Sequence, residues 1–298
     1  MSGQLKEVRD RIKSVKSTQQ ITKAMKMVSA AKLRKAQDAI VALRPYSNKL
    51  DQMLKNILSN IEGDASSSFG TERPVSKVLV VPVTSNRGLC GAFNSNIVKE
   101  AAKIIEKHDD VRKAGNLTIL PIGKKGFDGL KNKYKDCNMN MDHMGVFEDL
   151  SFDNVSIVSS FIMDQFQEGG FDKIYVCYGR FKNAALQFAE AVQFLPVEKL
   201  ESAPGLTESK LKADYIFEPS KEELLENLIP SILQTTFQKF LLDTNASEHG
   251  ARMTAMDKAT ENAEEMVKDL RISYNKARQE AITKELSEIV GGAAALGG

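Results

Sequence analysis

Apolar side chains at the start of the chain recur every three or four residues, with polar residues between them. In order they are Leu5, Val8, Ile12, Val15, Ile21, Met25, Val28, Leu33, Ala36, Ile40, Leu43, Leu50, Leu54, Ile57 and Ile61. After Gly3 no glycine occurs before Gly63, and Pro45 is the only proline in that stretch. Because glycine and proline are the residues that most often interrupt helices, the pattern predicts one long helix over 1–62. A narrow apolar seam with shifts in its spacing is typical of a coiled coil.

The other end of the chain also combines apolar spacing with a lack of helix breakers. Its seam is Met253, Met256, Ala259, Ala263, Met266, Leu270, Tyr274, Ala277 and Ala281, and we expect it to end near Ile289. Glu264 and Lys268 stand four residues apart, a spacing that favours an ion pair on the outer face of a helix. A second long helix is therefore predicted within 208–298, with a capping box at 220–223 before it and Pro230 at its opening or at a kink.

Two helices of this length must reach beyond a single globule, and neither is apolar enough to pass through a core. Antiparallel pairing of the two terminal helices is the economical arrangement, with the middle of the chain connecting them.

The middle of the chain, 75–200, changes to short apolar runs separated by stretches with helical spacing. Strands are predicted at 77–83, 117–122 and 173–178, helices at 96–107 and 155–166, and an edge strand at 186–197. Polar linkers at 63–73 and 201–207 flank this region. Alternating strands and helices indicate a small parallel sheet. The predicted fold class is therefore α+β overall, with a long antiparallel coiled coil of the N- and C-terminal helices and a central Rossmann-like α/β domain.

Composition narrows the class of protein. The chain has 298 residues, of which 42% are hydrophobic and 27% charged, as in globular rather than disordered proteins. No window approaches 18 consecutive apolar residues, and residues 1–16 lack the features of a signal or transit peptide, so we expect neither a membrane span nor an export sequence. Cys90, Cys137 and Cys177 have no metal-ligand spacing and cannot all pair, which indicates structural thiols in a reducing compartment.

Three features could carry catalytic chemistry, and for each the residues favour a structural role. Residues 85–94 lie between a predicted strand and a helix, where a doubly wound fold holds phosphate, but their spacing fits no known phosphate-binding pattern. Cys90 could act as a nucleophile, yet no histidine lies near it in sequence. Residues 123–126, Gly-Lys-Lys-Gly, lack the Walker spacing, so a surface turn is expected. Since no metal-binding histidine pattern or catalytic carboxylate pair was found either, we predict no catalytic, cofactor or metal site.

Charge is distributed unevenly, although the net charge is only +2. Between residues 11 and 37 there are eight Lys or Arg and no Asp or Glu. A basic helix can bind nucleic acid, anionic lipid or an acidic protein. Tyr46 is the only aromatic residue of this helix, which argues against nucleic acid, and the absence of Trp and Phe from the seam argues against lipid. Because solvated helix faces usually mix both signs, the stretch predicts an acidic protein surface around it.

Three blocks of this sequence resemble the gamma subunit of F-type ATP synthases. The first block is 12–34, including the run Thr18–Val28. The second is the turn at 85–96, which is similar to the family pattern S-[DN]-R-G-L-C-G-[AG]-[FY]-N. The third comprises 247–256 and 274–296. The blocks occur in the family's order and cover essentially the whole chain.

The resemblance implies a rotor shaft that couples ion-driven rotation of the c ring to ATP synthesis or hydrolysis at the beta subunits, with no catalytic site and no cofactor of its own. The implied partners are the alpha and beta subunits, the epsilon subunit and the c ring, without nucleic acid or a direct membrane span. The implied location is the cytoplasmic face of a bacterial inner membrane. The implied rotor–stator contacts are Lys23, Met25, Lys26, Arg252, Met256, Gln279, Thr283 and Glu288. The resemblance also identifies a family turn in the central domain, formed by Arg87, Gly88, Leu89, Cys90 and Gly91.

Further expectations follow from the resemblance. The face around Lys23 and Lys26 would meet acidic loops of beta, and the uncharged tip, 291–298, would act as a bearing. The closely spaced cysteine pair of redox-regulated chloroplast forms is absent, so no redox gating is expected.

Two other hypotheses stand beside this one: a basic coiled-coil protein that binds nucleic acid, and an α/β enzyme with helical arms. Salt-sensitive DNA binding would favour the first and turnover by the isolated chain the second, whereas co-purification with alpha and beta would exclude both.

Overall fold

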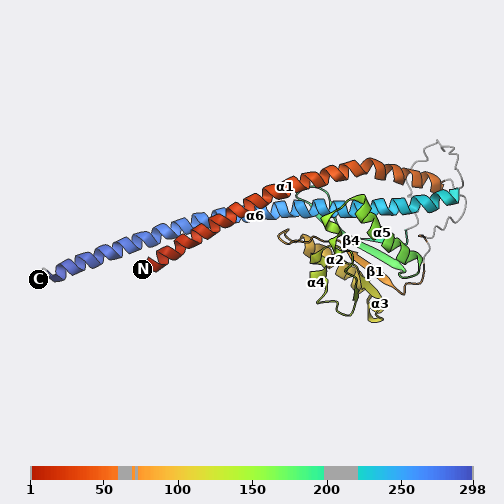
Figure 1. Ribbon diagram of the computed structural model, residues 1–298. Coiled ribbons are helices and arrows are strands. Elements are labelled where there is room, and N and C mark those ends of the chain that lie inside the picture. The colour runs from red at the N-terminus through yellow and green to blue at the C-terminus, as the bar shows by residue number, and fades with distance from the viewer. Residues whose placement is uncertain (1, 60–68, 71–72, 198–220, 297–298) are drawn as a thin grey trace. The chain divides into compact units, whose positions relative to one another are not determined.

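The computed structural model describes residues 2–59, 69–70, 73–197 and 221–296. Its two longest elements are the helices α1 (Ser2–Ser59) and α6 (Lys221–Leu296), and the strands lie between them in sequence (Figure 1). The chain divides into two compact units, which we name the helical unit (Met1–Ala30 with Arg252–Gly298) and the sheet unit (Ala31–Ala251). Each long helix contributes residues to both units. No helix within the described ranges is long and apolar enough to cross a membrane.

In the helical unit, α1 and α6 lie side by side and run in opposite directions (Figure 1). Arg9 donates a hydrogen bond to the Tyr274 hydroxyl at 2.9 Å. Further along, the Thr260 hydroxyl donates to Thr22 Oγ1 at 2.8 Å. Residue numbers therefore rise along α1 as they fall along α6. The predicted antiparallel pairing of the terminal helices is confirmed.

The seam of α1 differs from the predicted one where the apolar spacing shifts. Ile21 and Val28, predicted to be buried, are 58% and 57% exposed, whereas their neighbours Thr22 and Ser29 are buried. Small polar side chains can occupy a seam because they let the helices approach closely and can bond locally. Thr22 does so, since its hydroxyl also donates to the Gln19 carbonyl at 3.0 Å.

The seam of α6 is also displaced at one position and ends earlier than predicted. Met266 is 46% exposed, and the adjacent Val267 is buried in its place. Ala281 is buried, every residue from 282 to 292 is exposed, and Ile289, the expected end of the seam, is 72% exposed. The predicted contact between Glu264 and Lys268 is present at 3.9 Å.

Several predictions for the long helices concern residues outside the described ranges. These are the linkers at 63–73 and 201–207, apart from 69–70 and 73, the seam position Ile61, the capping residue Ser220 and the last two residues of the tip. Pro230 and Pro45 both lie inside helices that continue past them.

The sheet unit contains a five-stranded sheet in the order β3-β2-β1-β4-β5. Its strands are β1 (Val78–Pro82), β2 (Leu117–Ile119), β3 (Asn138–Met139), β4 (Lys173–Phe181) and β5 (Gln187–Leu195). The first four strands are parallel, and β5 pairs with β4 in the antiparallel sense. The predicted edge strand is therefore confirmed as β5. The sequence did not predict β3, because two residues without an apolar run give no strand signal.

Helices cover both faces of this sheet. They are α2 (Phe93–Lys107), α3 (Asp109–Lys113), α4 (Lys124–Leu130), a 3-10 helix (Met144–Glu148) and α5 (Phe152–Gln167). Alternate residues of β1 point to opposite faces, so Val78 and Val80 pack with Ile97 of α2, whereas Leu79 packs with Ile162 of α5. The part of α6 around Phe237 joins the α5 layer.

The segment 123–126 is not the surface turn that its sequence predicted. Gly123 and Gly126 are buried, and α4 begins at Lys124. Gly123 has a φ of 94°, and a Cβ placed there would lie 2.0 Å from the Thr84 carbonyl oxygen. Gly126 donates its backbone N–H to Thr84 Oγ1 at 2.7 Å. These glycines permit close packing of α4 against the end of β1.

The helix α6 meets β4 at another close approach. Thr244 Oγ1 accepts a hydrogen bond from the Gly179 backbone N–H at 3.2 Å, and Ser247 Oγ donates to the Gly179 carbonyl at 3.0 Å. A Cβ on Gly179 would lie 2.7 Å from the Phe93 ring and 3.3 Å from Ser247 Cβ. The absence of a side chain at Gly179 therefore lets both α2 and α6 approach this position of β4 closely.

Candidate interaction surface

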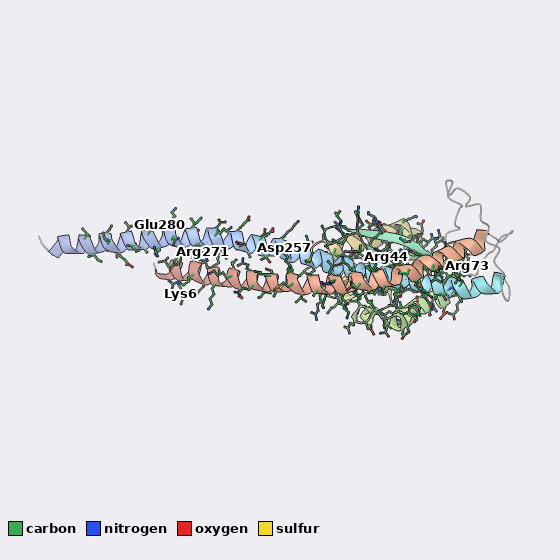
Figure 2. All side chains as sticks on the ribbon, turned by 90° about the horizontal axis from the view of Figure 1, so that it is seen from above. Lys6, Arg44, Arg73, Asp257, Arg271 and Glu280 are labelled. Carbon is green, nitrogen blue, oxygen red and sulfur yellow. The ribbon has the colours of Figure 1, made fainter. Side chains whose placement is uncertain are left out.

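The basic residues predicted to contact a partner lie on α1 in the helical unit. Lys23 is exposed. Lys26 forms a salt bridge across the helix pair with Asp257, and both side chains remain about two-fifths exposed. Figure 2 shows Asp257 among the side chains along α6. Lys26 is therefore partly neutralised within the chain, and Lys23 is the less constrained positive charge.

Three further predicted contact residues are partly or fully enclosed by the chain itself. Arg252 and Met256 are buried, and Met25 is intermediate. Thr260 Oγ1 also lies 2.7 Å from the Met256 carbonyl oxygen, close to its contact with Thr22. Arg252 and Met256 thus belong to the packing of the helical unit, a role that sequence alone did not assign to them.

The remaining predicted contacts, Gln279, Thr283 and Glu288, are exposed on α6 around and beyond the last buried seam position. This part of α6 also exposes large apolar side chains that the predictions did not include: Ile282, Leu286, Ile289 and Val290, each more than half exposed. Their exposure could have been anticipated only by knowing where the partner helix stops.

The α1 half of the helical unit has a comparable apolar surface. Ile21, Met27 and Val28 are each more than half exposed on the same segment as Lys23. Adjacent large apolar side chains on a surface are unfavourable in water and mark interaction sites. The helical unit therefore presents an apolar and basic surface without acidic residues between 11 and 37, suited to a protein partner.

The family turn lies in the sheet unit and is held by its own side chains. Asn94 donates from Nδ2 to Ser85 Oγ at 2.8 Å and to Cys90 Sγ at 3.1 Å, and its Oδ1 accepts from the Ser85 backbone N–H at 3.0 Å. Arg87 and Leu89 are exposed, and Leu89 has a φ of 64°. Ser85 and Asn94 close the turn, so the polar groups at its base are occupied by one another.

The rest of the turn is anchored to α4 by backbone groups. The Lys124 N–H donates to Asn86 Oδ1 at 3.1 Å, and the Lys125 N–H donates to the Ser85 carbonyl at 3.1 Å. Gly88 and Gly91 are exposed. The turn therefore presents its middle to solvent on a rigid base.

The thiols have the properties of structural residues. Cys90 is 2% exposed and receives the hydrogen bond from Asn94. Burial raises the pKa of Cys137 to about 11 and that of Cys177 to about 12, which keeps both protonated and unreactive at neutral pH. In the ranges that the structure describes, no group of three or more His, Cys, Asp or Glu side chains could hold a metal ion.

Known proteins resemble the chain over nearly its full length. Residues 4–296 match the ATP synthase family. The ATP synthase gamma chain of Cytophaga hutchinsonii is 51% identical over 98% of both chains. That of Christiangramia forsetii is 52% identical over 99% of both. The fold is shared with a chain of the Euglena gracilis mitochondrial ATP synthase, which has a TM-score of 0.66 at 22% identity and is aligned over 99% of this chain and 95% of its own.

Proposed function

Because the chain belongs to the gamma-chain family of ATP synthases, we propose that its helical unit is the part of the rotor that the catalytic head encloses. The chain is a non-catalytic subunit of the central stalk of the synthase. Its rotation couples ion transport to ATP synthesis or hydrolysis at other subunits.

The exposed surface of the helical unit is the observation that carries this proposal. Large apolar residues of helices in water are usually buried against a neighbouring element, yet Ile21, Met27 and Val28 are exposed on α1, as are Leu286 and Ile289 on α6. A surrounding protein would remove this area from water. Acidic segments of that protein would also neutralise the positive charges.

The proposed stator contacts are the residues that the family resemblance implied: Lys23, Met25, Lys26, Arg252, Met256, Gln279, Thr283 and Glu288. Lys23, Gln279, Thr283 and Glu288 act directly because their side chains are exposed. Arg252 and Met256 act by holding the shape of the helix pair because they are buried. The alpha and beta subunits are the proposed partners at this surface.

We assign the remaining parts of the chain as follows. Residues 1–62 and 208–298 form the shaft, and 75–200 form the domain that docks with the epsilon subunit on the c ring. The family turn, 87–91, is a rigid, exposed element of that domain and a candidate contact. The proposed location is the cytoplasmic face of a bacterial inner membrane, as a peripheral part of the synthase.

Reversing the charge of Lys23 tests the contact surface. In the assembled synthase, Lys23→Glu replaces attraction to an acidic partner by repulsion at an exposed site, at a cost of roughly 1 kcal/mol. We expect assembly to survive and ATP-driven proton pumping per ATP hydrolysed to fall. The matched control is Lys49→Glu, which is also exposed on α1 but lies in the sheet unit.

Lys26 needs a separate control because of its salt bridge. Lys26→Glu would repel Asp257 within the chain as well as any acidic partner. Asp257→Asn breaks the salt bridge but leaves the Lys26 charge in place. The double variant Lys26→Glu with Asp257→Asn removes the repulsion within the chain. If the double variant impairs pumping and Asp257→Asn alone does not, the charge at position 26 acts on the partner. Unchanged pumping in both Lys23→Glu and Lys26→Glu would show that the basic face is an ordinary solvated surface.

A further inference from the structure

A cavity of about 370 Å³ lies inside the sheet unit between α1, the end of β4 and α6. Its lining includes Ile40, Arg44, Arg180, Lys239, Leu242 and Asp243. Its volume falls in the range of sites for small organic molecules. Aliphatic side chains form part of the wall, and charged groups converge on the same space.

The charges around the cavity are predominantly positive. Arg44 of α1, Arg180 of β4 and Lys239 of α6 each contribute a cation to the lining. One of the three is already paired, because Arg180 Nε lies 2.6 Å from Glu190 Oε1. Two cations thus remain to balance the carboxylate of Asp243.

Asp243 is the one acidic residue in the lining, and it is 9% exposed. Loss of hydration on burial raises its pKa to about 6, even though Lys239, Arg44 and Arg180 all favour the charged form. The negative charge of Glu190 acts in the other direction and disfavours the ionised form of Asp243. Tyr178 is the other titratable group that faces it, and its own pKa is raised mainly by burial. The Asp243 carboxylate can therefore gain a proton close to neutral pH.

We propose that this cavity binds a small soluble oxyanion of the phosphate type, and that Asp243 gains a proton when the anion binds. Arg44 and Lys239 supply hydrogen-bond donors and positive charge, and guanidinium groups match the geometry of phosphate oxygens. Protonated Asp243 becomes a donor to the anion instead of repelling it. The aliphatic wall formed by Ile40 and Leu242 accommodates an organic group attached to the phosphate. Neither the rotary function nor the stator contacts require such a site.

Proton uptake makes binding dependent on pH in a defined direction. An anion beside Asp243 disfavours the ionised carboxylate, so by linkage a protonated Asp243 favours the anion. Sulfate is the appropriate probe because it keeps its charge from pH 6 to pH 8, whereas phosphate itself titrates. If only the protonated form binds, affinity at pH 8 is up to about fifty-fold weaker than at pH 6, given a pKa near 6.

The test is calorimetric titration of the full-length chain with sulfate against chloride at equal ionic strength, at pH 6 and pH 8. We expect saturable binding that weakens at least about five-fold at pH 8. Asp243→Asn should bind at pH 8 as well as the natural chain does at pH 6, with no pH dependence. Arg44→Gln should abolish binding, and Arg34→Gln, an exposed arginine of α1 outside the cavity lining, should not.

Several outcomes would overturn the proposal. If sulfate gives no saturable heat at either pH, the cavity does not bind the anion. If Arg44→Gln binds sulfate as well as the natural chain does, the anion binds elsewhere. Lys239→Gln provides a second lining variant if Arg44→Gln loses its far-UV circular dichroism. Glycerol phosphate and vesicles of phosphatidylglycerol then distinguish the source of the anion. Binding to the vesicles alone would contradict a soluble ligand.

Discussion

Substituting Gly179 by alanine tests the close packing of α2 and α6 against β4 at this position. The added Cβ would lie 2.7 Å from Cε2 of Phe93 and 3.3 Å from Ser247 Cβ. The Phe93 ring is 7% exposed and packs in the buried cluster of α2, so it has little room to move. Ser247 is fixed by its hydrogen bond to the Gly179 carbonyl. Either the ring or the helix must shift.

The cost follows from two opposing effects. Overpacking a well-filled core costs about 1 to 3 kcal/mol. Alanine restricts the unfolded chain more than glycine does, which offsets about 0.4 to 1 kcal/mol because Gly179 does not have a positive φ. The expected net loss for Gly179→Ala is therefore about 1 to 2 kcal/mol. This loss of stability should arise in the sheet unit, which contains Gly179.

Hydrogen exchange of the β4 amides, followed with urea unfolding of the full-length chain, measures this loss where it arises. The control is Gly145→Ala, because a Cβ there meets nothing within 4 Å. We expect the control to leave β4 protection unchanged. Equal protection of β4 in Gly179→Ala and Gly145→Ala would refute the packing argument.

The double variant Gly179→Ala with Phe93→Leu locates the clash. A smaller side chain at Phe93 makes room for the new methyl group, so the second substitution should cost at least about 0.5 kcal/mol less in the alanine background than in the natural chain. If the free-energy costs of the two substitutions simply add, β4 or α6 shifts to relieve the clash and the Phe93 ring does not.

Three other predictions concern charge, pH and the tip. Lys26→Asp should lower the melting temperature of the chain by an amount corresponding to about 0.2 to 1 kcal/mol, and adding Asp257→Lys should recover it at low salt; failure to recover would show that the salt bridge contributes nothing. The folded-state pKa of Asp243 is raised to about 6 from 3.8, so the folded chain binds more protons than the unfolded chain between those values and loses stability as pH rises through them. Urea unfolding at several pH values should show a loss of at most about 3 kcal/mol that is complete above pH 6 and absent in Asp243→Asn; an identical pH profile in the variant would contradict this. Deleting 291–298 should leave melting unchanged because residues 282–292 of α6 are all exposed, and should preserve substantial ATPase of the assembled synthase while lowering assembly yield. Loss of both ATPase and pumping by complexes that still contain the subunit would show that the tip bears torque.

The sequence by itself determined the longer helices and strands and the family, although it predicted neither β3 nor α4. Long stretches without glycine or proline and with apolar spacing predict helices, because local backbone preference and one buried face suffice to form them. The strands at 78–82 and 173–181 were equally visible as apolar runs buried on both faces. The turn at 85–94 was recognised from its resemblance to the family pattern, and the structure shows that Ser85 and Asn94 of this pattern bond to each other.

Only the tertiary structure decided which residues of those elements are buried. Thr22 displaces Ile21 from the seam, and Val267 displaces Met266, because burial depends on the facing helix and small polar groups can meet there at close range. Lys26 pairs with Asp257 for the same reason, since the facing helix brings the carboxylate to it. The facing helix also determines that exposed residues follow Ala281, although the sequence predicted a seam that continues to Ile289. Apolar spacing records that a residue can be buried, whereas the position of the neighbouring element determines whether it is.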